Sequence, residues 1–291
     1  MKDLAYYNGR ITPASEMMIP AEDRAFYFGD GIYDVTTVHG GKCFALDDHA
    51  ARFYGNARKM RFDLGMTLPE LKELCLDLCA KLDEDVKEAV LYFQASRGTA
   101  PRNHAFPDGG KANLYFTLKP AKLKTIGQEV AAITLPDKRF EFCDIKTLNL
   151  LPNVLAAQEA AEQGVYETIF HRDRIVTEGS HSGVSIFSGG RFITPPLSPH
   201  ILPSVTRKHY LELATALGVP AEEREFSVGE MNAADEVVIM SSTAPLNRCR
   251  KIDGLDVGGR DPEIIALFAR AYAEKITAET GAEANLAEAY K

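Results

Sequence analysis

The spacing of apolar residues in the first half of the chain alternates between strand-like and helix-like, and each spacing predicts an element. Leu4 to Asn8 and Gly9 to Thr12 are two short strand-like runs joined at Asn8-Gly9, a dipeptide typical of a two-residue hairpin turn. A further strand is expected from Ile32 to His39, turning at Gly40-Gly41 into a partner over Cys43 to Leu46. These patterns predict two antiparallel pairs near the N-terminus.

Helical spacing follows these strands. The first helix is expected to have Asp47-Asp48 as its cap and to run to about Arg61. The second begins at Pro69, with Glu70 in its first turn, and carries an apolar stripe of leucine and cysteine. Two strands joined by a long loop come next, at Ala89–Ser96 and Asn113–Leu118.

The second half is richer in short apolar runs. They predict strands at Val130–Leu135, Glu167–His171, Val184–Phe187, Arg191–Thr194 and Glu236–Met240. Helices are predicted at Pro152–Gln163, Val205–Leu217 and Pro262 to about Thr280. Because strands and helices do not alternate strictly, we expect an α+β (mixed α/β) fold, with either open sheets or a closed, barrel-like sheet in this half.

The length of 291 residues exceeds that of a usual single domain, so two domains are expected. We predict an N-terminal α/β domain at 1–120, a linker at 121–128 and a C-terminal α/β domain at 129–291 that carries Lys146. Ligand sites are often built where two domains meet. We therefore expect the site at the domain interface.

Charge and composition narrow the class of protein. The net charge is -8, and Lys and Arg are spread along the chain, so nucleic acid is not an expected partner. No apolar run is long enough for a membrane span or a signal core, and a cytoplasmic location with no membrane partner is expected. The odd set of cysteines is expected to be buried thiols and not a metal site: Cys43, Cys75, Cys79, Cys143 and Cys249.

Lys146 stands in the largely apolar stretch from Cys143 to Leu151, directly before a predicted helix. An ammonium group is costly in apolar surroundings because burial disfavours its charged form. Such a lysine either extends its charged end to solvent or acts as a Schiff-base nucleophile. The stretch alone favours the solvent-exposed reading.

Two clusters in the first half are suited to a charged ligand. Gly29 and Gly31 flank Asp30 before a predicted strand and permit a tight turn that aims Tyr33 into a cleft. Arg52, on the first predicted helix, has a planar guanidinium that suits phosphate. The structural alternatives are a turn with a packed tyrosine and a solvated or salt-bridged arginine.

Two more clusters lie further along. The loop from Arg97 to His104 contains two arginines and a histidine, a set that suits a carboxylate or is simply a solvated basic loop. The segments Val176 to Ser182 and Ser241 to Thr243 combine small residues and hydroxyls at strand ends. Such backbone and hydroxyl donors cradle an anion or form an ordinary turn.

The order of these clusters is more informative than any one of them. They are Asp23-Arg24, Phe28-Gly29-Asp30-Gly31-Ile32-Tyr33, Asp48-His49 with Arg52, Arg97-Gly98-Thr99-Ala100-Pro101-Arg102-Asn103-His104, Asp144-Ile145-Lys146-Thr147-Leu148-Asn149, Thr177-Glu178-Gly179-Ser180, Thr206-Arg207 and Ser241-Ser242-Thr243. With them the chain resembles the fold-type IV pyridoxal-phosphate enzymes, most closely the bacterial D-amino acid transaminases, over roughly residues 1 to 275. The arginine-histidine loop is the narrower, D-specific mark.

The resemblance implies pyridoxal 5′-phosphate as the cofactor. Lys146 would hold it as a Schiff base and move a proton to and from the substrate Cα, and Glu178 would face the pyridine nitrogen. The residues implied for the phosphate are Arg52, Val205, Thr206, Ser241 and Ser242.

The resemblance also implies substrates and an assembly. Tyr33, Arg102 and His104 would bind the α-carboxylate, and because the loop reaches a neighbouring subunit in relatives, a homodimer is implied. The expected reaction converts D-alanine and 2-oxoglutarate to pyruvate and D-glutamate by a ping-pong mechanism. The alternatives are a branched-chain L-amino acid aminotransferase, then an aminodeoxychorismate lyase or an (R)-amine transaminase, or a non-catalytic relative.

Two positions depart from the motif of the resembling family, and a third lies near the expected pocket for the substrate side chain. His181 and Gly183 stand where relatives carry serine and asparagine, behind the implied cofactor. For His181, packing is favoured over tuning of the cofactor ring. Pro245 lies just beyond the implied phosphate hydroxyls, in a loop expected to limit the side-chain pocket.

Overall fold

The computed structural model describes residues 1–290, and contacts between residues divide it into two compact units. Unit 1 comprises Met1–Leu123, Ile145–Asn149 and Glu279–Ala282, and unit 2 comprises Lys124–Asp144, Leu150–Ala278 and the residues from Glu283 onward. The boundary after Leu123 falls inside the segment expected to be a linker.

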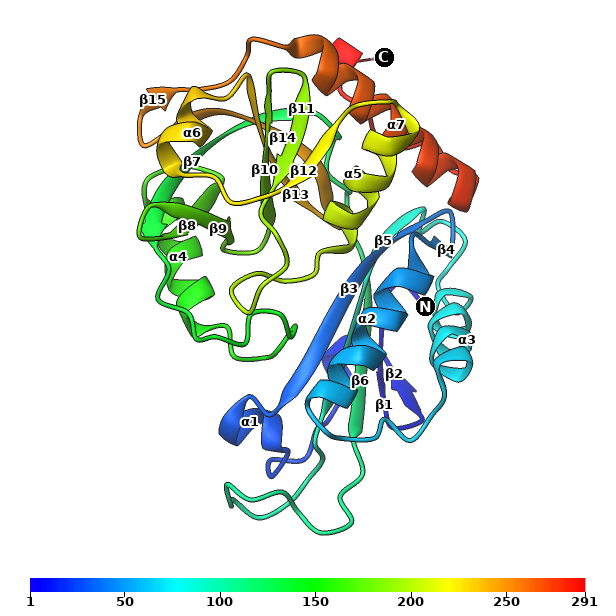
Figure 1. The fold of residues 1–291 in the computed structure, drawn as a ribbon. Helices are drawn as coiled ribbons and strands as arrows, with labels where there is room; N and C mark the ends of the chain where they lie inside the picture. Colours follow the sequence, from blue (N-terminus) through cyan, green and yellow to red (C-terminus); the bar gives the residue numbers. More distant parts are fainter. Residues whose placement is uncertain (291) are drawn as a thin grey trace. The chain divides into compact units, whose positions relative to one another are not determined.

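Unit 1 is built on a six-stranded antiparallel sheet with the order β2-β1-β6-β5-β3-β4. Its strands are β1 (Leu4–Tyr7), β2 (Arg10–Thr12), β3 (Gly31–His39), β4 (Lys42–Cys43), β5 (Glu88–Ser96) and β6 (Asn113–Pro120). Its helices are α1 (Arg24–Phe28), α2 (Leu46–Lys59) and α3 (Leu68–Cys79), with a 3-10 turn at Ala14–Glu16 (Figure 1).

Helices α2 and α3 supply the apolar side chains that cover the sheet of unit 1. Alternate residues of β5 are buried, because successive side chains of a strand point to opposite faces. Phe93 of β5 packs edge-on against Phe53 of α2, with ring centroids 5.0 Å apart. Leu71 and Leu78 of α3 join the same core. This half of the protein therefore has its own hydrophobic core.

Local patterns predicted most of unit 1. The hairpin between β1 and β2 is confirmed, with Asn8 and Gly9 both at positive φ (46° and 93°), as a type I′ turn requires. Helix α3 is confirmed too, and Thr67 and Glu70 cap it reciprocally. The short helix α1, capped by Asp23, was not predicted.

The start of α2 was predicted incorrectly. Leu46, expected to end a strand, is the first helical residue, and the preceding Ala45 is left-handed (φ 52°) and supplies no side-chain cap. Asp47 and Asp48 lie inside the first turn instead of capping it. There their charges still favour the helix, because the N-terminus of a helix carries partial positive charge.

Unit 2 contains a nine-stranded mixed sheet with the order β12-β11-β10-β13-β14-β7-β8-β9, and β15 pairs with β14. Its strands are β7 (Gln128–Pro136), β8 (Glu167–Arg172), β9 (Ile175–Gly179), β10 (Gly183–Ser188), β11 (Arg191–Thr194), β12 (Ala221–Glu223), β13 (Glu236–Ser241), β14 (Ala244–Ile252) and β15 (Leu255–Asp256). Its helices are α4 (Leu151–Glu162), α5 (Val205–Ala216), α6 (Val228–Ala233) and α7 (Pro262–Thr280), followed by a 3-10 turn at Glu288–Tyr290. The last two residues of α7 group with unit 1.

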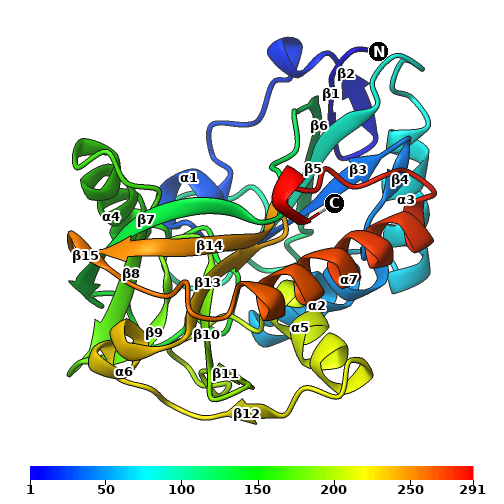
Figure 2. The ribbon, with the colours of Figure 1, turned by 90° about the horizontal axis from the view of Figure 1, so that it is seen from above.

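Helices α5 and α7 lie beside each other along part of this sheet (Figure 2). Aromatic side chains connect them to each other and to the sheet. Phe268 of α7 stacks on Tyr210 of α5 at 5.5 Å and packs edge-on against Phe187 of β10 at 5.0 Å. All three rings are buried. Aromatic contacts of this kind add to the stabilisation that burial alone provides.

The mixed α+β prediction is confirmed, and of its two versions the open sheet is correct. All five strands predicted for this half are present, and the three helices begin within one residue of the predicted positions. Among residues 1–290 the ladder order ends at β12 and β9, so the strands do not close into a ring. Strand β14 was missed although it is central to the sheet.

The segment Ile145–Asn149 corrects the expected C-terminal domain, because it groups with unit 1. The physical reason is backbone pairing: the Tyr33 N–H donates to the Lys146 carbonyl (2.9 Å) and the Leu148 N–H donates to the Gly31 carbonyl (3.1 Å). The short segment thereby runs alongside the start of β3.

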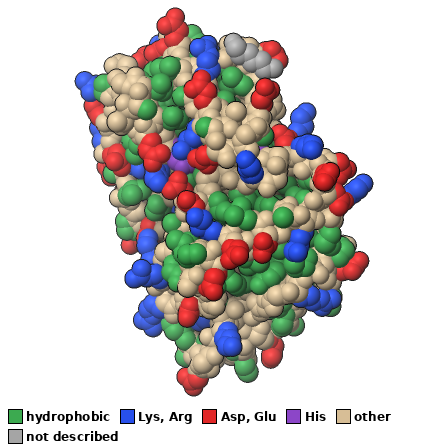
Figure 3. Space-filling model, turned by 90° about the vertical axis from the view of Figure 1, so that its right-hand side faces the viewer, with side chains coloured by type: hydrophobic (Ala, Val, Ile, Leu, Met, Phe, Trp, Pro, Cys, Tyr) green, Lys and Arg blue, Asp and Glu red, His purple; other side chains and the backbone are tan. Residues whose placement is uncertain are grey.

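On the face shown in Figure 3, Lys and Arg side chains are interspersed with Asp and Glu. No helix within residues 1–290 combines the length and the apolar composition needed to cross a bilayer. In the same residues, no three His, Cys, Asp or Glu side chains gather as a metal-binding group.

Candidate active site

The predicted site residues fall into two groups, one in each unit. The lysine group, in unit 1, contains Tyr33, Arg52, Arg102, His104 and Lys146. The glutamate group, in unit 2, contains Glu178, Val205, Thr206, Ser241 and Ser242.

Lys146 lies beside Tyr33, as the pairing of its segment with β3 requires. Its ammonium nitrogen is 4.3 Å from the centroid of the Tyr33 ring. Gly31 makes this close approach possible, because a Cβ atom there would lie 2.5 Å from the Ala95 carbonyl and 2.8 Å from the Leu148 side chain. The glycine predicted to aim Tyr33 is thus needed for a close approach of backbone segments.

Tyr33 is also supported from its other side. Its ring stacks on Tyr92 of β5, with centroids 5.5 Å apart and an interplanar angle of 23°. The Tyr92 hydroxyl in turn donates to Gln94 (2.7 Å). Burial, with Tyr33 and Tyr115 adding to it, raises the pKa of Tyr92. Tyr33 is therefore held between an aromatic ring and the lysine that it accompanies.

Arg52 is oriented by a fully buried carboxylate. Its Nε and Nη2 atoms donate to the two oxygens of Asp34 on β3, at 2.8 and 2.7 Å. His49, one turn earlier on α2, contacts the same carboxylate at 2.8 Å. Burial would raise the pKa of Asp34, but Arg52 and His49 outweigh it and hold that pKa well below its ordinary value.

The pKa of His49 lies below its ordinary value. Burial lowers its pKa, and although Asp34 opposes this effect, the positive charges of Arg52 and Lys146 add to it. In the sequence, Asp34 directly follows the motif that ends at Tyr33, and His49 belongs to the motif Asp48-His49. No role was predicted for either residue. The signal available was spacing: His49 and Arg52 are three residues apart and so lie on one face of a helix.

The loop that carries Arg102 and His104 is fastened to unit 1 by two buried arginines. Arg24 and Arg97 both donate from Nε to Asp30 (2.8 and 2.9 Å). Arg24 also donates to the Asn103 carbonyl at 2.6 Å. Because Asn103 lies between Arg102 and His104, this hydrogen bond sets the backbone from which both project.

Arg102 and His104 meet on one aromatic ring. The Arg102 guanidinium is 5.2 Å and the His104 ring 5.1 Å from the centroid of Phe28, and both side chains are exposed. The structure thus brings this pair together on Phe28, whereas the contacts of Tyr33 are with Lys146 and Tyr92. Two exposed donors that contact the same ring suit a carboxylate.

In unit 2, Glu178 is held by an arginine that sequence reasoning missed. Arg139 Nη1 donates to one oxygen of Glu178, and the Leu202 N–H donates to the other at 3.0 Å. Arg139 is itself paired with Asp137 through Nε and Nη2, at 3.0 and 2.8 Å. Burial would lower the pKa of Arg139, but Asp137 and Glu178 outweigh it and raise that pKa. A permanently charged partner stabilises Glu178 as an anion.

The start of α5 has the features of an anion site. Val205 is its first residue, as predicted, and the Ser204 side chain caps it by accepting from the Arg207 N–H (3.2 Å). Thr206 follows, and its hydroxyl oxygen is buried without a hydrogen-bond partner among the described residues. A buried hydroxyl without a partner is costly, so its presence at a helix N-terminus points to a ligand that supplies one.

Ser241 lies where β13 ends. Its hydroxyl accepts from the Ala244 N–H (3.2 Å) and lies 3.4 Å from the Thr243 hydroxyl.

Elsewhere in unit 2, one small cavity of about 10 Å³ is lined by Glu178, Ser204, Arg207 and Met240. The cavity is too small for a ligand, but it shows that the carboxylate and the start of α5 lie in the same region of unit 2.

His181 packs against the ring of Tyr166, with centroids 6.0 Å apart, and also contacts a buried carboxylate. Its Nδ1 is 3.1 Å from Glu167, while about half of its side chain is exposed. Ser180 and Ser182 donate to the same carboxylate. Burial would raise the pKa of Glu167, but His181 and the two hydroxyls outweigh it and lower that pKa. At Gly183, a Cβ atom would meet Met240 at an ordinary contact distance of 3.5 Å, so there is room for a Cβ atom there.

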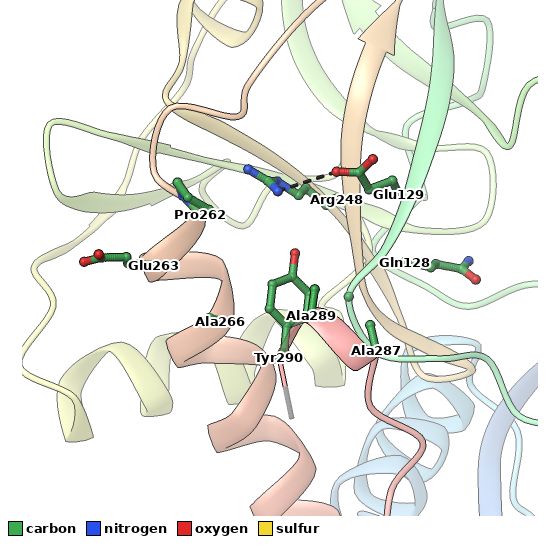
Figure 4. A pocket seen from close by; sticks show the side chains of 10 residues that line it. Gln128, Glu129, Arg248, Pro262, Glu263, Ala266, Ala287, Ala289 and Tyr290 are labelled. Carbon is green, nitrogen blue, oxygen red and sulfur yellow. Dashed lines mark ion pairs between the residues drawn. The ribbon is translucent and has the colours of Figure 1, made fainter.

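A larger pocket of unit 2 lies away from these residues. It has a volume of about 470 Å³ and is lined by the start of β7, by Arg248, by the start of α7 and by the segment that ends at Tyr290 (Figure 4). Arg248 is already paired with Glu236 (2.7 Å) and lies 3.5 Å from Glu129. None of the predicted site residues lines this pocket, so we do not assign the active site to it.

Comparison with known proteins identifies the family. The profile of amino-transferase class IV matches residues 31–252. The chain belongs to this family. It is an aminotransferase, and its fold is that of the fold-type IV enzymes, as the resemblance implied.

Two curated relatives of the chain are D-alanine aminotransferases. The one from Bacillus licheniformis is 38% identical over 260 residues, which cover 88% of this chain and 90% of the relative. The one from Staphylococcus epidermidis is 37% identical over 255 residues, covering 87% and 90%. Among solved structures, the branched-chain amino acid aminotransferase of Escherichia coli matches with a TM-score of 0.87 over 96% of both chains. At 21% identity this likeness shows the fold alone.

Proposed function

We propose that this class IV aminotransferase transfers the amino group of D-alanine to 2-oxoglutarate, yielding pyruvate and D-glutamate. The observation that carries the proposal is the similarity to D-alanine aminotransferases over nine tenths of their length. The pairing of Arg102 with His104 on Phe28 supports it, because this loop is the mark of the D-specific members in the resemblance drawn above.

Residues of both groups fit pyridoxal 5′-phosphate. The buried Thr206 hydroxyl lacks a partner, and a phosphate oxygen would supply one, together with the N–H groups of Val205 and Thr206. Arg52, fixed by Asp34, offers a permanent positive charge for the same phosphate. Ser241 and Ser242 are assigned to it as further donors.

Pyridoxal phosphate, when bound, supplies an aromatic ring that takes up the electron pair left when the substrate Cα loses its proton. We assign Lys146 as the residue that attaches to it and that accepts and returns this proton at Nζ. Glu178, stabilised as an anion by Arg139, is assigned to keep a proton on the ring nitrogen. Arg102, His104 and Tyr33 are assigned to the substrate carboxylate.

A homodimer belongs to the same proposal. Unit 2 exposes several large apolar side chains, and exposed apolar side chains that gather on a surface are typical of an interface. They are Phe140, Phe142, Leu151, Val154 and Leu155. We also propose a cytoplasmic location, since five free thiols suit a reducing compartment.

A substrate panel tests the proposal. Purified protein with added cofactor is incubated with 2-oxoglutarate and either D-alanine, L-leucine or an (R)-amine, and the oxo product is measured. We expect pyruvate from D-alanine and little product from the others. If L-leucine reacted and D-alanine did not, the result would instead identify a branched-chain aminotransferase, the activity named for the structural relative.

One further arm addresses the lyase alternative. An aminodeoxychorismate lyase releases pyruvate from its substrate without any oxo-acid acceptor. Omitting 2-oxoglutarate should therefore abolish sustained turnover here. Continued pyruvate release from aminodeoxychorismate in its absence would contradict the proposal.

A further inference from the structure

Two cysteines of unit 1 lie in contact although they are 36 residues apart in the sequence. The Sγ atoms of Cys43 and Cys79 are 3.3 Å apart. Cys43 ends β4, the edge strand of the sheet, and Cys79 ends α3. We propose that this pair is a reversible modification site, at which a hydroperoxide oxidises the two thiols to a disulfide.

The geometry requires only a small movement. The two sulfur atoms must approach by about 1.2 Å to reach the bond length of about 2.05 Å. Cys43 is on a two-residue edge strand that follows Gly40 and Gly41, both at positive φ (55° and 81°). A short edge strand after a glycine turn has few backbone bonds to hold it, so it can shift more easily than the interior strands.

Access and charge favour this pair over a single buried thiol. Cys43 is half-buried, whereas Cys79 is 3% exposed. Their mutual hydrogen bond, together with burial, raises the pKa of Cys43. The same hydrogen bond lowers the pKa of Cys79 against the opposing effect of burial. Either sulfur can donate in this hydrogen bond, and the donor stabilises the thiolate of its partner.

The chemistry balances with hydrogen peroxide as oxidant. The thiolate of the pair attacks one peroxide oxygen, the O–O bond breaks, and a sulfenic acid forms while the leaving hydroxide takes up a proton to become water. The second sulfur, losing its proton, attacks the sulfenic sulfur. The S–O bond breaks and a second water leaves. Two thiols are oxidised by two electrons, and one peroxide is reduced to two waters.

The other three thiols serve as internal comparisons. Cys75 is fully buried one turn before Cys79, and burial, with Cys79 and Asp34 adding to it, raises its pKa to about 12. Burial also raises the pKa of Cys249, to about 12. Cys143 is half-buried like Cys43, but it donates to the Phe140 carbonyl (3.2 Å), and burial raises its pKa to about 11. We expect none of them to react at the rate of the pair.

The test uses the reduced full-length protein. It is treated with hydrogen peroxide, the remaining thiols are alkylated, and the peptides are mapped by mass spectrometry. We expect one cross-linked peptide joining Cys43 and Cys79, the loss of two hydrogen atoms in the intact mass, and full reversal by dithiothreitol. Cys143 should be alkylated before and after treatment.

Variants separate this pair from its neighbours. Cys43→Ser and Cys79→Ser should each abolish the cross-link, whereas Cys75→Ala and Cys143→Ser should retain it. The wild-type map remains decisive if a variant fails to fold. Five alkylated cysteines after treatment, a cross-link between two molecules, or sulfinic acid at Cys43 or Cys79 without a cross-link would each overturn the proposal.

Discussion

The lysine group and the glutamate group use buried counter-charges of opposite sign. In unit 1 the functional group is a cation: Arg52 is held by the buried carboxylate of Asp34. In unit 2 the functional group is an anion: Glu178 is held by the buried guanidinium of Arg139, which Asp137 holds in turn. A charged side chain that must present one edge to a ligand needs its other edge fixed, and each unit achieves this with a partner from a neighbouring segment.

The largest expected effect comes from removing the counter-charge in unit 1. Asp34→Asn leaves Arg52 partly buried without its anion, which should lower the free energy of unfolding by about 3–5 kcal/mol. Urea unfolding followed by circular dichroism measures it. Asp47→Asn is the matched control, because Asp47 is 81% exposed in its pair with Lys72, and it should cost less than about 1 kcal/mol. Equal losses would mean that burial of the pair is unimportant.

The corresponding change in unit 2 should act on catalysis. Arg139→Met removes the cation beside Glu178 while keeping a side chain of similar length, and should lower kcat by about 10²-fold. Arg172→Met is the control: Arg172 also contacts Asp137 (3.3 Å) and is more exposed. Steady-state kinetics with D-alanine would count against the role of Arg139 if both variants lost the same activity.

A smaller effect is expected at the exposed pair on Phe28. Arg102→Ala should raise the KM for D-alanine by about 10- to 100-fold, the range of one charge-assisted pair, with the visible absorption of bound cofactor unchanged. Lys111→Ala, a cation of the same loop, is the control. An unchanged KM would show that the carboxylate binds elsewhere.

The smallest effect concerns pH. The folded-state pKa of His49 lies below its ordinary value of 6.5, so below that pH the unfolded chain binds a proton that the folded chain does not. Stability is therefore lost as pH falls below about 6.5. Between pH 7 and 5 the wild type should lose up to about 1–2 kcal/mol more than His49→Asn. Thermal melts at several pH values measure this, and parallel curves for the two proteins would contradict it.

Elements that depend on local pattern could be predicted from the sequence. The turn at Asn8-Gly9 and the cap of α3 each involve residues within four positions of one another. Strand β14 could not be predicted in this way, because its buried residues include Asn247 and Arg248, and polar residues in a strand read as a loop. They are buried because Gln128 and Glu236, distant in sequence, bind them.

The candidate site likewise contains residues that could be predicted from short motifs and residues that could not. Lys146, Glu178 and Thr206 stand in short motifs whose order could be recognised. Arg139 stands in no such motif, and its importance lies in a contact with Glu178, 39 residues away. Sequence reasoning finds the residues that act on a ligand more readily than the residues that hold them, because the latter are defined by packing.

Lys146 is the residue that the proposed function assigns to the cofactor, and borohydride labelling tests this assignment most directly. Protein loaded with pyridoxal phosphate is reduced with borohydride, digested, and the modified peptide is identified by mass spectrometry. We predict a single pyridoxyl group on Lys146, loss of the visible absorption band on reduction, and neither result in Lys146→Ala. Stoichiometric label on another lysine, or an unchanged band in Lys146→Ala, would contradict the assignment.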